Sequence, residues 1–482
     1  MTSEEKRLLE EWGYRLPATA QAAAARSDLA PVIVSAPLDE IPPLDREGLE
    51  TLLQAFEINP AEVLARARVA WDSELTEDSL RQALVEARDA MATPVETTAK
   101  VQATAQFLWT KRLPAEFTFP LMDLNEIPIN IGDRKFETKA DASRWAVFCG
   151  PFVLESKLLP PAPFRWHSAP AYPGRFVYKL LEPTPNQPLR VALFSDFGTG
   201  LYHSCYIAKQ IRHFAYPYAI HLGDVYYAGR ASEYDTNFKA QLDPILARTK
   251  LFTMLGNHDM YSSAFAFFDY LDERKRSYPN LQEQQGSYFA LRSQKFQIVV
   301  GETEYFDRFR CRQPDVLDWM ERVLREGRNS GLMNILLTSD QPYEYGKPES
   351  TMLFRDLELF IRDRLIDVWF WGNTHYCALF DRSEQYPFIG SCIGHGGYPY
   401  SRYYRGQIEP APVLFLETQA RFPSWTNVRQ DRGNNGYCVL ELADDGTFAI
   451  RYLDWMGNER CLASLRRLQP GTPIRITVTM PV

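Results

Sequence analysis

The sequence predicts an α/β fold of the α+β sandwich type, with a central β-sandwich flanked by helices and a small N-terminal all-α domain. From about residue 189, apolar runs of strand length alternate with helical patterns, as in a sheet protein with crossover helices. Several of these runs end in polar or glycine residues. The first 100 residues contain few aromatic residues and are rich in Ala, Glu, Leu and Arg, which sets them apart from the rest of the chain.

Residues 1–110 are expected to form the helical domain. Asn59, Pro60 and Glu62 form a helix-start pattern, with a capping residue, a proline in the first turn and an acid at the third position. One apolar helical face follows, made by Leu80, Leu84, Ala87 and Met91. This domain either packs against the main domain or docks a protein partner. The Pro- and aromatic-rich segment 111–185 is expected to connect it to the main domain through short strands.

The main domain is expected at 186–465, followed by a C-terminal strand in 466–482. Its predicted strands include "RVALF", "YAIH", "LFTM", "FQIVV", "NILLT" and "DVWFW". The helix after the first of them is expected to turn Ile207, Ile211 and Phe214 inward. A hairpin turn is expected at Asp444-Asp445-Gly446.

Composition excludes several classes of function. With 45% hydrophobic and 24% charged residues the chain resembles a globular protein, and its net charge of -8 provides no overall basic field to attract nucleic acid. The seven cysteines lack CxxC spacing, so we expect buried free thiols. The N-terminus has no apolar signal region and no run reaches about 20 apolar residues, so we expect a cytoplasmic protein without a membrane span.

Three short motifs carry the chemistry: "SDFG", "GDVYY" and "GNHD". They place Asp196, Asp224 and Asn257 at the ends of three successive predicted strands. The intervals of 28 and 33 residues each suit one strand–helix–strand crossover of roughly 30 residues. These side chains should therefore meet at one edge of a sheet, where open α/β folds bind ligands. Each aspartate could instead cap the following helix.

These motifs resemble the calcineurin-like metallophosphoesterase superfamily, over roughly 186–460, and most closely its purple acid phosphatase branch. The resemblance implies two metal positions. The first metal position would be held by Asp196, Asp224, Tyr227 and His375, and iron is the ion expected there. The second metal position would share Asp224 and use Asn257. Tyr226 stands beside Tyr227, and either phenol could simply pack in the core, as could the imidazole of His375.

The second metal position departs from the superfamily pattern. Where a histidine is usual after a late strand, the chain has Ser339 followed by Asp340. Where Gly-His-x-His is usual, it has "GNTH", with Asn373 in place of the first histidine. Hydroxyl and amide oxygens are weaker ligands than imidazole for a borderline metal, so this position is expected to hold Mn, Mg or Zn weakly or to be empty. Asp340 could restore a negative ligand if its loop shifts.

The remaining candidates lie around the metals. His258 would donate a proton or hydrogen bond to the leaving oxygen, and Asp259 would orient it, although the two could simply stabilise a turn. His395 and Arg230 could contact substrate phosphate, although a structural or surface role is the alternative for each.

The hypothesis is a metal-dependent phosphoesterase that acts on a small phosphorylated mono- or diester. The alternatives are a hydrolysis-deficient binding or regulatory protein and a one-metal iron enzyme.

Overall fold

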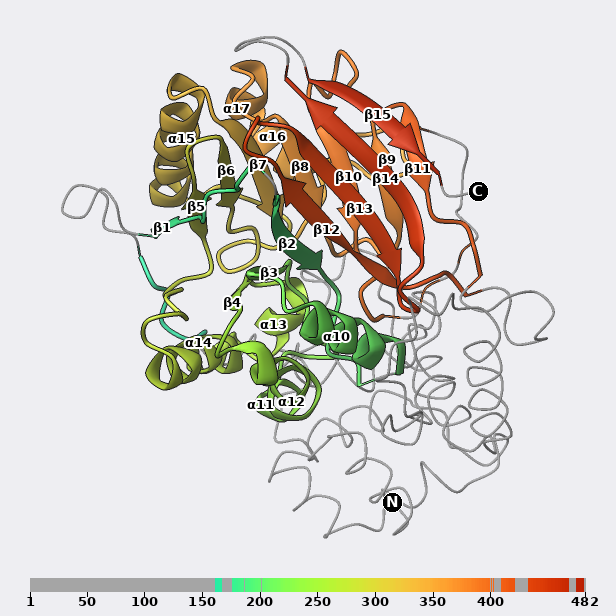
Figure 1. Cartoon of the computed structure of the whole chain (residues 1–482). Coiled ribbons are helices and arrows are strands. Elements are labelled where there is room, and N and C mark those ends of the chain that lie inside the picture. The colour runs from blue at the N-terminus through green and yellow to red at the C-terminus, as the bar shows by residue number, and fades with distance from the viewer. Residues whose placement is uncertain are drawn as a thin grey trace, which may run out of the picture.

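The computed structural model describes residues 161–166, 176–185, 187–200, 202–398, 400, 402, 409–420, 432–467 and 474–480. The predicted helical domain at 1–110 and most of the connecting segment lie outside these residues. The described part has two packed β-sheets with helices on their outer faces (Figure 1), which confirms the predicted sandwich.

One sheet contains the strands that precede the three motifs. Its order is β15-β14-β13-β12-β2-β3-β4, and β2, β3 and β4 run parallel to one another. The strands are β2 (Leu189–Phe194), β3 (Tyr218–His221), β4 (Lys250–Thr253), β12 (Gly436–Leu442), β13 (Phe448–Asp454), β14 (Glu459–Arg466) and β15 (Arg475–Thr479). The hairpin expected around Asp444 to Gly446 joins β12 and β13.

The other sheet contains the late motifs. Its order is β1-β5-β6-β7-β8-β10-β9-β11, with β6, β7, β8 and β10 parallel. The strands are β1 (Val177–Lys179), β5 (Phe289–Arg292), β6 (Phe296–Val300), β7 (Met333–Thr338), β8 (Val368–Trp371), β9 (Cys377–Phe380), β10 (Ile389–Ile393) and β11 (Val413–Leu416).

Helices cover both sheets, and those of the described residues include none long and apolar enough to cross a bilayer. Beside β2–β4 are α10 (Tyr202–Phe214), α11 (Ala231–Glu233), α12 (Ala240–Leu242), α13 (Asn257–Tyr261) and α14 (Phe265–Ser277). Beside β6–β8 are α15 (Pro314–Asn329), α16 (Met352–Asp356) and α17 (Glu358–Arg362). Ile207 and Ile211 face inward as predicted. Phe214 was wrongly expected to do so: it ends α10 and is 44% exposed.

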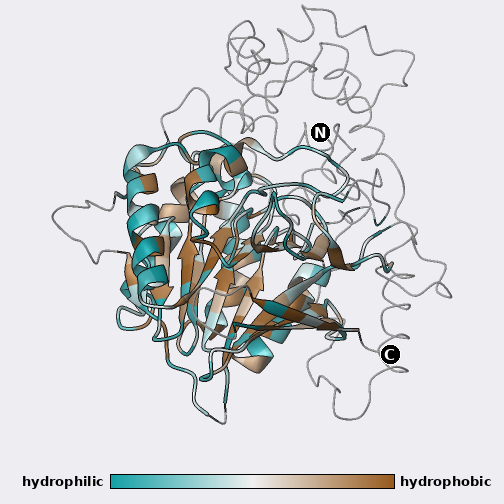
Figure 2. Ribbon diagram, turned by 90° about the horizontal axis from the view of Figure 1, so that it is seen from above, coloured by the Kyte–Doolittle hydropathy of each residue, from teal (hydrophilic) through white to brown (hydrophobic). Residues whose placement is uncertain are grey.

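The core follows the alternation of side chains along the strands. In β2, Val191 and Leu193 enter the core between the sheets, whereas Ala192 and Phe194 pack under the helices. Apolar colour accordingly runs along the strands in Figure 2, and polar colour marks the outward sides of the helices. The described cysteines are buried and free, as expected; they are Cys205, Cys311, Cys377, Cys392, Cys438 and Cys461.

This topology determines where the motifs meet. The parallel strands β2, β3 and β4 of one sheet and β6, β7 and β8 of the other end at the same side of the sandwich. A hydrogen bond from Asn373 N to Asp196 Oδ2, 3.0 Å long, joins the two sheets there. The loops after these strand ends therefore form one cluster of polar residues.

Candidate metal centre

Three of the candidate ligands have unusual backbone conformations. Asp196, Asp224 and Asn373 follow β2, β3 and β8, with φ values of 55°, 67° and 57°. Non-glycine residues rarely adopt this left-handed region, because Cβ crowds the backbone. Strain of this kind gathers at functional sites, where the surrounding structure holds it in place.

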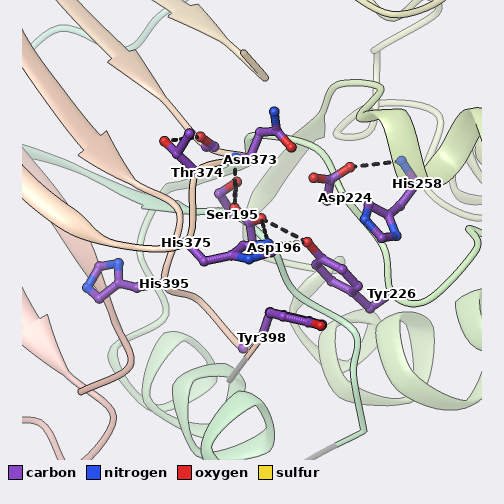
Figure 3. A network of polar contacts seen from close by, with 12 residues as sticks. Ser195, Asp196, Asp224, Tyr226, His258, Asn373, Thr374, His375, His395 and Tyr398 are labelled. Atoms are coloured by element: carbon purple, nitrogen blue, oxygen red, sulfur yellow. Dashed lines mark hydrogen bonds and ion pairs between the residues drawn. The ribbon is translucent and has the colours of Figure 1, made fainter. Parts of the chain in front are cut away.

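A carboxylate, a phenol and an imidazole converge in the first metal position (Figure 3). Tyr226 Oη donates to Asp196 Oδ1 over 3.1 Å, and His375 Nε2 lies 3.1 Å from the same oxygen and 2.5 Å from Tyr226 Oη. Burial opposes ionisation of Asp196, but the hydrogen bond and charge of His375 hold the pKa of this carboxyl below its ordinary value. We call Asp196, Tyr226 and His375 the Asp-Tyr-His trio.

The phenol of this trio belongs to Tyr226, the residue before the tyrosine singled out from the sequence. Tyr227 is also buried, with its ring centroid 6.2 Å from that of Tyr398. Its backbone is held by Glu233, whose carboxylate accepts hydrogen bonds from the N–H groups of Tyr227, Ala228 and Arg230. The prediction for Tyr227 stays a prediction, and Tyr226 joins it as a candidate ligand.

Asp224 and Asn257 each have one side-chain oxygen without a hydrogen-bond partner. Asp224 Oδ1 accepts from the N–H of His258 over 3.0 Å, while its buried Oδ2 has no hydrogen-bond partner. Burial, followed by the charge of Asp196, raises the pKa of Asp224 well above its ordinary value. Asn257 donates to Tyr261 Oη, which leaves its buried Oδ1 without a partner.

His258 has a fixed tautomer. Its Nδ1 lies 2.6 Å from the carbonyl oxygen of Tyr227, which can only accept, so Nδ1 carries the hydrogen. Burial lowers the pKa of His258 to about 3, so the ring is neutral near pH 7. Its Nε2 is therefore a proton acceptor in the resting state. To donate to a leaving group, Nε2 must first receive a proton.

Asp259 has contacts different from the expected one to the His258 ring. Its carboxylate accepts from the N–H groups of Gly256 and Asp224 and from Tyr234 Oη, at 2.9, 3.2 and 2.8 Å. Burial raises its pKa to about 7. These contacts fix the start of α13 against the turn that carries Asp224. Asp259 therefore positions Asp224 through the backbone.

The departures from the superfamily pattern are close together. Asn373 Nδ2 donates to Asp340 Oδ1 over 3.0 Å, and the buried hydroxyl of Ser339 has no partner. Sequence reasoning missed Glu304, which follows β6 and is 2% exposed beside Asp340. Its position after a buried strand, like that of the motif aspartates, was the signal that could have found it.

The two candidate substrate-binding residues, His395 and Arg230, lie outside the trio. His395 is 3% exposed, and burial lowers its pKa to about 4. Figure 3 shows its ring apart from the trio. Arg230 is half-buried at the start of α11, where its N–H donates to Glu233. Their predicted contacts with phosphate stay predictions.

The donor atoms fit a cation at the first metal position. Within the described part of the chain, no three His, Cys, Asp and Glu side chains form a group that could hold a metal. The trio reaches three donors by including a phenol, and its mixture of carboxylate, phenol and imidazole suits a transition metal. The orphaned Oδ2 of Asp224 supports the same conclusion, because buried polar atoms normally have partners.

A comparison with models of known protein families agrees with this architecture. Residues 189–377 match the family model described as calcineurin-like phosphoesterase. That segment contains every motif of the candidate metal centre. Residues 189–377 are therefore described as a calcineurin-like phosphoesterase domain within the chain. A search of curated proteins finds no match.

Solved structures with similar folds include two phosphatases. A purple acid phosphatase from yellow lupin (Lupinus luteus) shares 18% identity over 58% of this chain and 54% of its own, with a TM-score of 0.43. A dimetal phosphatase from Danio rerio shares 10% identity over 57% of this chain and 98% of its own, with a TM-score of 0.37. This chain thus spans about half the length of the lupin enzyme.

Proposed function

We propose that this chain hydrolyses a small phosphate mono- or diester in a metal-dependent reaction. The observation that carries the proposal is the convergence of Asp196, Tyr226 and His375 within 3.1 Å of one another, beside the open carboxylate oxygen of Asp224. The match of residues 189–377 to the calcineurin-like phosphoesterase model supports phosphoester hydrolysis in general. Iron at the first metal position is part of the proposal, because a phenol among the donors favours a strongly Lewis-acidic ion.

The residues of the site would have three roles: metal binding, proton transfer and positioning. Asp196, His375 and a tyrosine would hold the cation, and Asp224 would share it with the second metal position. A bound cation lowers the pKa of water and neutralises phosphoryl charge. His258 would take a proton at Nε2 and return it to the leaving oxygen, since its Nδ1 is committed to the Tyr227 carbonyl. Asp259 and Glu233 would keep these groups in register.

The test is hydrolysis of an aryl phosphate by the full chain after loading with iron and manganese. Asp224→Asn keeps the size of the side chain but removes its charge, so we expect a loss of roughly 100-fold or more in kcat/KM. Asp235→Asn is the matched control, because Asp235 pairs with Lys239 on the surface and should leave the rate unchanged. Equal rates in wild type and Asp224→Asn would refute the proposal.

A second candidate is a one-metal iron enzyme with non-hydrolytic chemistry. It is favoured by the contrast between the complete trio and the missing imidazoles at Ser339 and Asn373. Elemental analysis separates the two: one tightly held iron per chain with no hydrolysis of any aryl phosphate favours the second candidate.

A further inference from the structure

Arg308 is a cation near the site that has no acidic partner. It lies in the loop between β6 and α15, together with Arg310 and Arg312. Arg310 contacts both carboxylate oxygens of Asp356, at 2.6 and 2.7 Å, and Arg312 pairs with Asp307 at 2.7 Å. Within the described part of the chain, the guanidinium of Arg308 makes no hydrogen bond or ion pair. Its N–H donors are therefore available to a bound anion.

An aromatic contact places Arg308 at the edge of the metal centre. Its Cζ lies 4.8 Å from the ring centroid of Tyr261, in a cation–π contact. Tyr261 ends α13, and its ring packs on that of His258 with centroids 4.7 Å apart. The hydroxyl of Tyr261 accepts a hydrogen bond from Asn257. Arg308 is thus one side chain away from His258 and from Asn257.

The charge of Arg308 acts on the same site. Burial lowers the pKa of His258 to about 3, and the charge of Arg308 contributes in the same direction. Burial raises the pKa of Glu304 well above its ordinary value, and Arg308 opposes that rise. A positive charge at the edge of a site lined by carboxylates attracts an anionic substrate that those carboxylates would repel.

The loop that carries Arg308 is braced before any ligand binds. The N–H of Arg310 donates to the carbonyl oxygen of Thr303 over 3.1 Å, which closes the loop, and the pair of Arg310 with Asp356 ties it to α16. Phe309, the residue after Arg308, has a φ of 61°, which a bulky side chain rarely adopts. Such strain persists only where the surroundings hold it, and it is typical of functional sites.

We propose that Arg308 is a substrate-binding residue, and that the substrate is a phosphate ester with a second phosphate group close to the one that is cleaved. A guanidinium can donate to two phosphate oxygens at once. Because Arg308 contacts Tyr261 rather than the candidate metal ligands, it suits a phosphate beyond the one at the metal. This inference rests on the proposed function, whose substrate class it narrows.

Calorimetric titration of the iron-loaded full chain with pyrophosphate and with inorganic phosphate tests this role. Pyrophosphate is the smallest probe with two adjacent phosphates, so the wild type should bind it more tightly than inorganic phosphate. Arg308→Gln should weaken pyrophosphate binding about tenfold or more, as expected for lost charge-assisted hydrogen bonds, and should weaken phosphate binding much less. Elemental analysis after each titration checks that pyrophosphate has not removed the metal.

Two further variants make the comparison specific. Arg308→Lys keeps the charge without the planar group, so its pyrophosphate affinity should be intermediate, and it carries the test if Arg308→Gln does not fold. Arg190→Gln is the matched control, because it removes the same charge at the start of β2, where Arg190 pairs with Glu441. It should bind both probes as the wild type does.

Thermal unfolding separates substrate binding from a purely structural role. If Arg308 only balanced the charge of buried acids, Arg308→Gln would unfold at a lower temperature and keep the wild-type ratio of pyrophosphate to phosphate affinity. An unchanged ratio in Arg308→Gln, or a wild type that binds pyrophosphate no better than phosphate, would overturn the proposal.

The two proposals fail differently. If the wild type does not hydrolyse aryl phosphates while Arg308→Gln selectively loses pyrophosphate binding, the binding role of Arg308 stands and the proposed function falls. If hydrolysis depends on Asp224 while Arg308→Gln binds both probes like the wild type, the function stands and the role of Arg308 falls.

Discussion

At the scale of single residues, the phenol that contacts Asp196 and His375 belongs to Tyr226, the neighbour of the tyrosine that the family resemblance suggests as a ligand. The motif places Tyr227 at the position of a phenolate ligand, but Tyr226 is the residue whose Oη reaches Asp196 and His375. The ring of Tyr226 also packs between His258 and Tyr398, with centroids 4.2 and 4.7 Å away. Its phenol is therefore held in place independently of any ion.

This arrangement predicts which phenol binds iron. The iron-loaded Tyr226→Phe variant should lose the visible phenolate-to-iron absorption band and bind iron more weakly, because Phe lacks the donor oxygen. Tyr227→Phe is the matched control and should keep the band. Visible absorption together with iron stoichiometry measures both effects. A band lost in Tyr227→Phe and kept in Tyr226→Phe would show that the motif position provides the ligand.

At the scale of elements, the site depends on close approach of the turn after β3 to the start of α13. Gly256 precedes that helix, and a Cβ there would lie 2.1 Å from Asp224 Oδ1. Asp259 fixes the same contact from the other side through the N–H groups of Gly256 and Asp224. The spacing between these two elements therefore sets the orientation of the Asp224 carboxylate.

Gly256→Ala should displace Asp224, with a loss of about 1–3 kcal/mol in the free energy of unfolding from overpacking and weaker Mn²⁺ binding. Gly331→Ala is the control, since Gly331 has a φ of +74° but open space around its Cβ position. It should lose stability from backbone strain and keep its metal affinity. Urea unfolding and calorimetry measure the two quantities, and unchanged metal binding in Gly256→Ala would contradict the argument.

At the scale of the whole molecule, buried neutral histidines make stability depend on pH. His221 is fully buried, its Nδ1 is 3.0 Å from Thr253 Oγ1, and its ring packs against Phe194 and Phe238. Burial lowers its pKa from 6.5 to about 3. The unfolded chain therefore binds a proton between pH 6.5 and about 3 that the folded chain does not bind.

The stability that neutral His221 contributes is thus complete above pH 6.5 and is lost as the pH falls towards 3, by up to about 1.4 kcal/mol per pH unit. His221→Phe should flatten the decline of unfolding free energy over this range by that amount, whatever its effect on packing. Urea unfolding at several pH values gives the slopes. Identical slopes in the two proteins would mean that His221 is protonated in the folded state.

The sequence by itself determined the strands, because short apolar runs that end in polar or glycine residues are typical of buried strands followed by loops. It also predicted Asp196, Asp224 and Asn257 as site residues, because their spacing fits crossovers in a parallel sheet, and His375 from the GNTH motif. Only the tertiary structure decided that Tyr226 contacts Asp196 and His375, that Asp259 braces a turn, and that Glu304 lies beside Asp340. Those three outcomes depend on loop conformation and on two sheets packed face to face, and neither leaves a periodic signal in the chain.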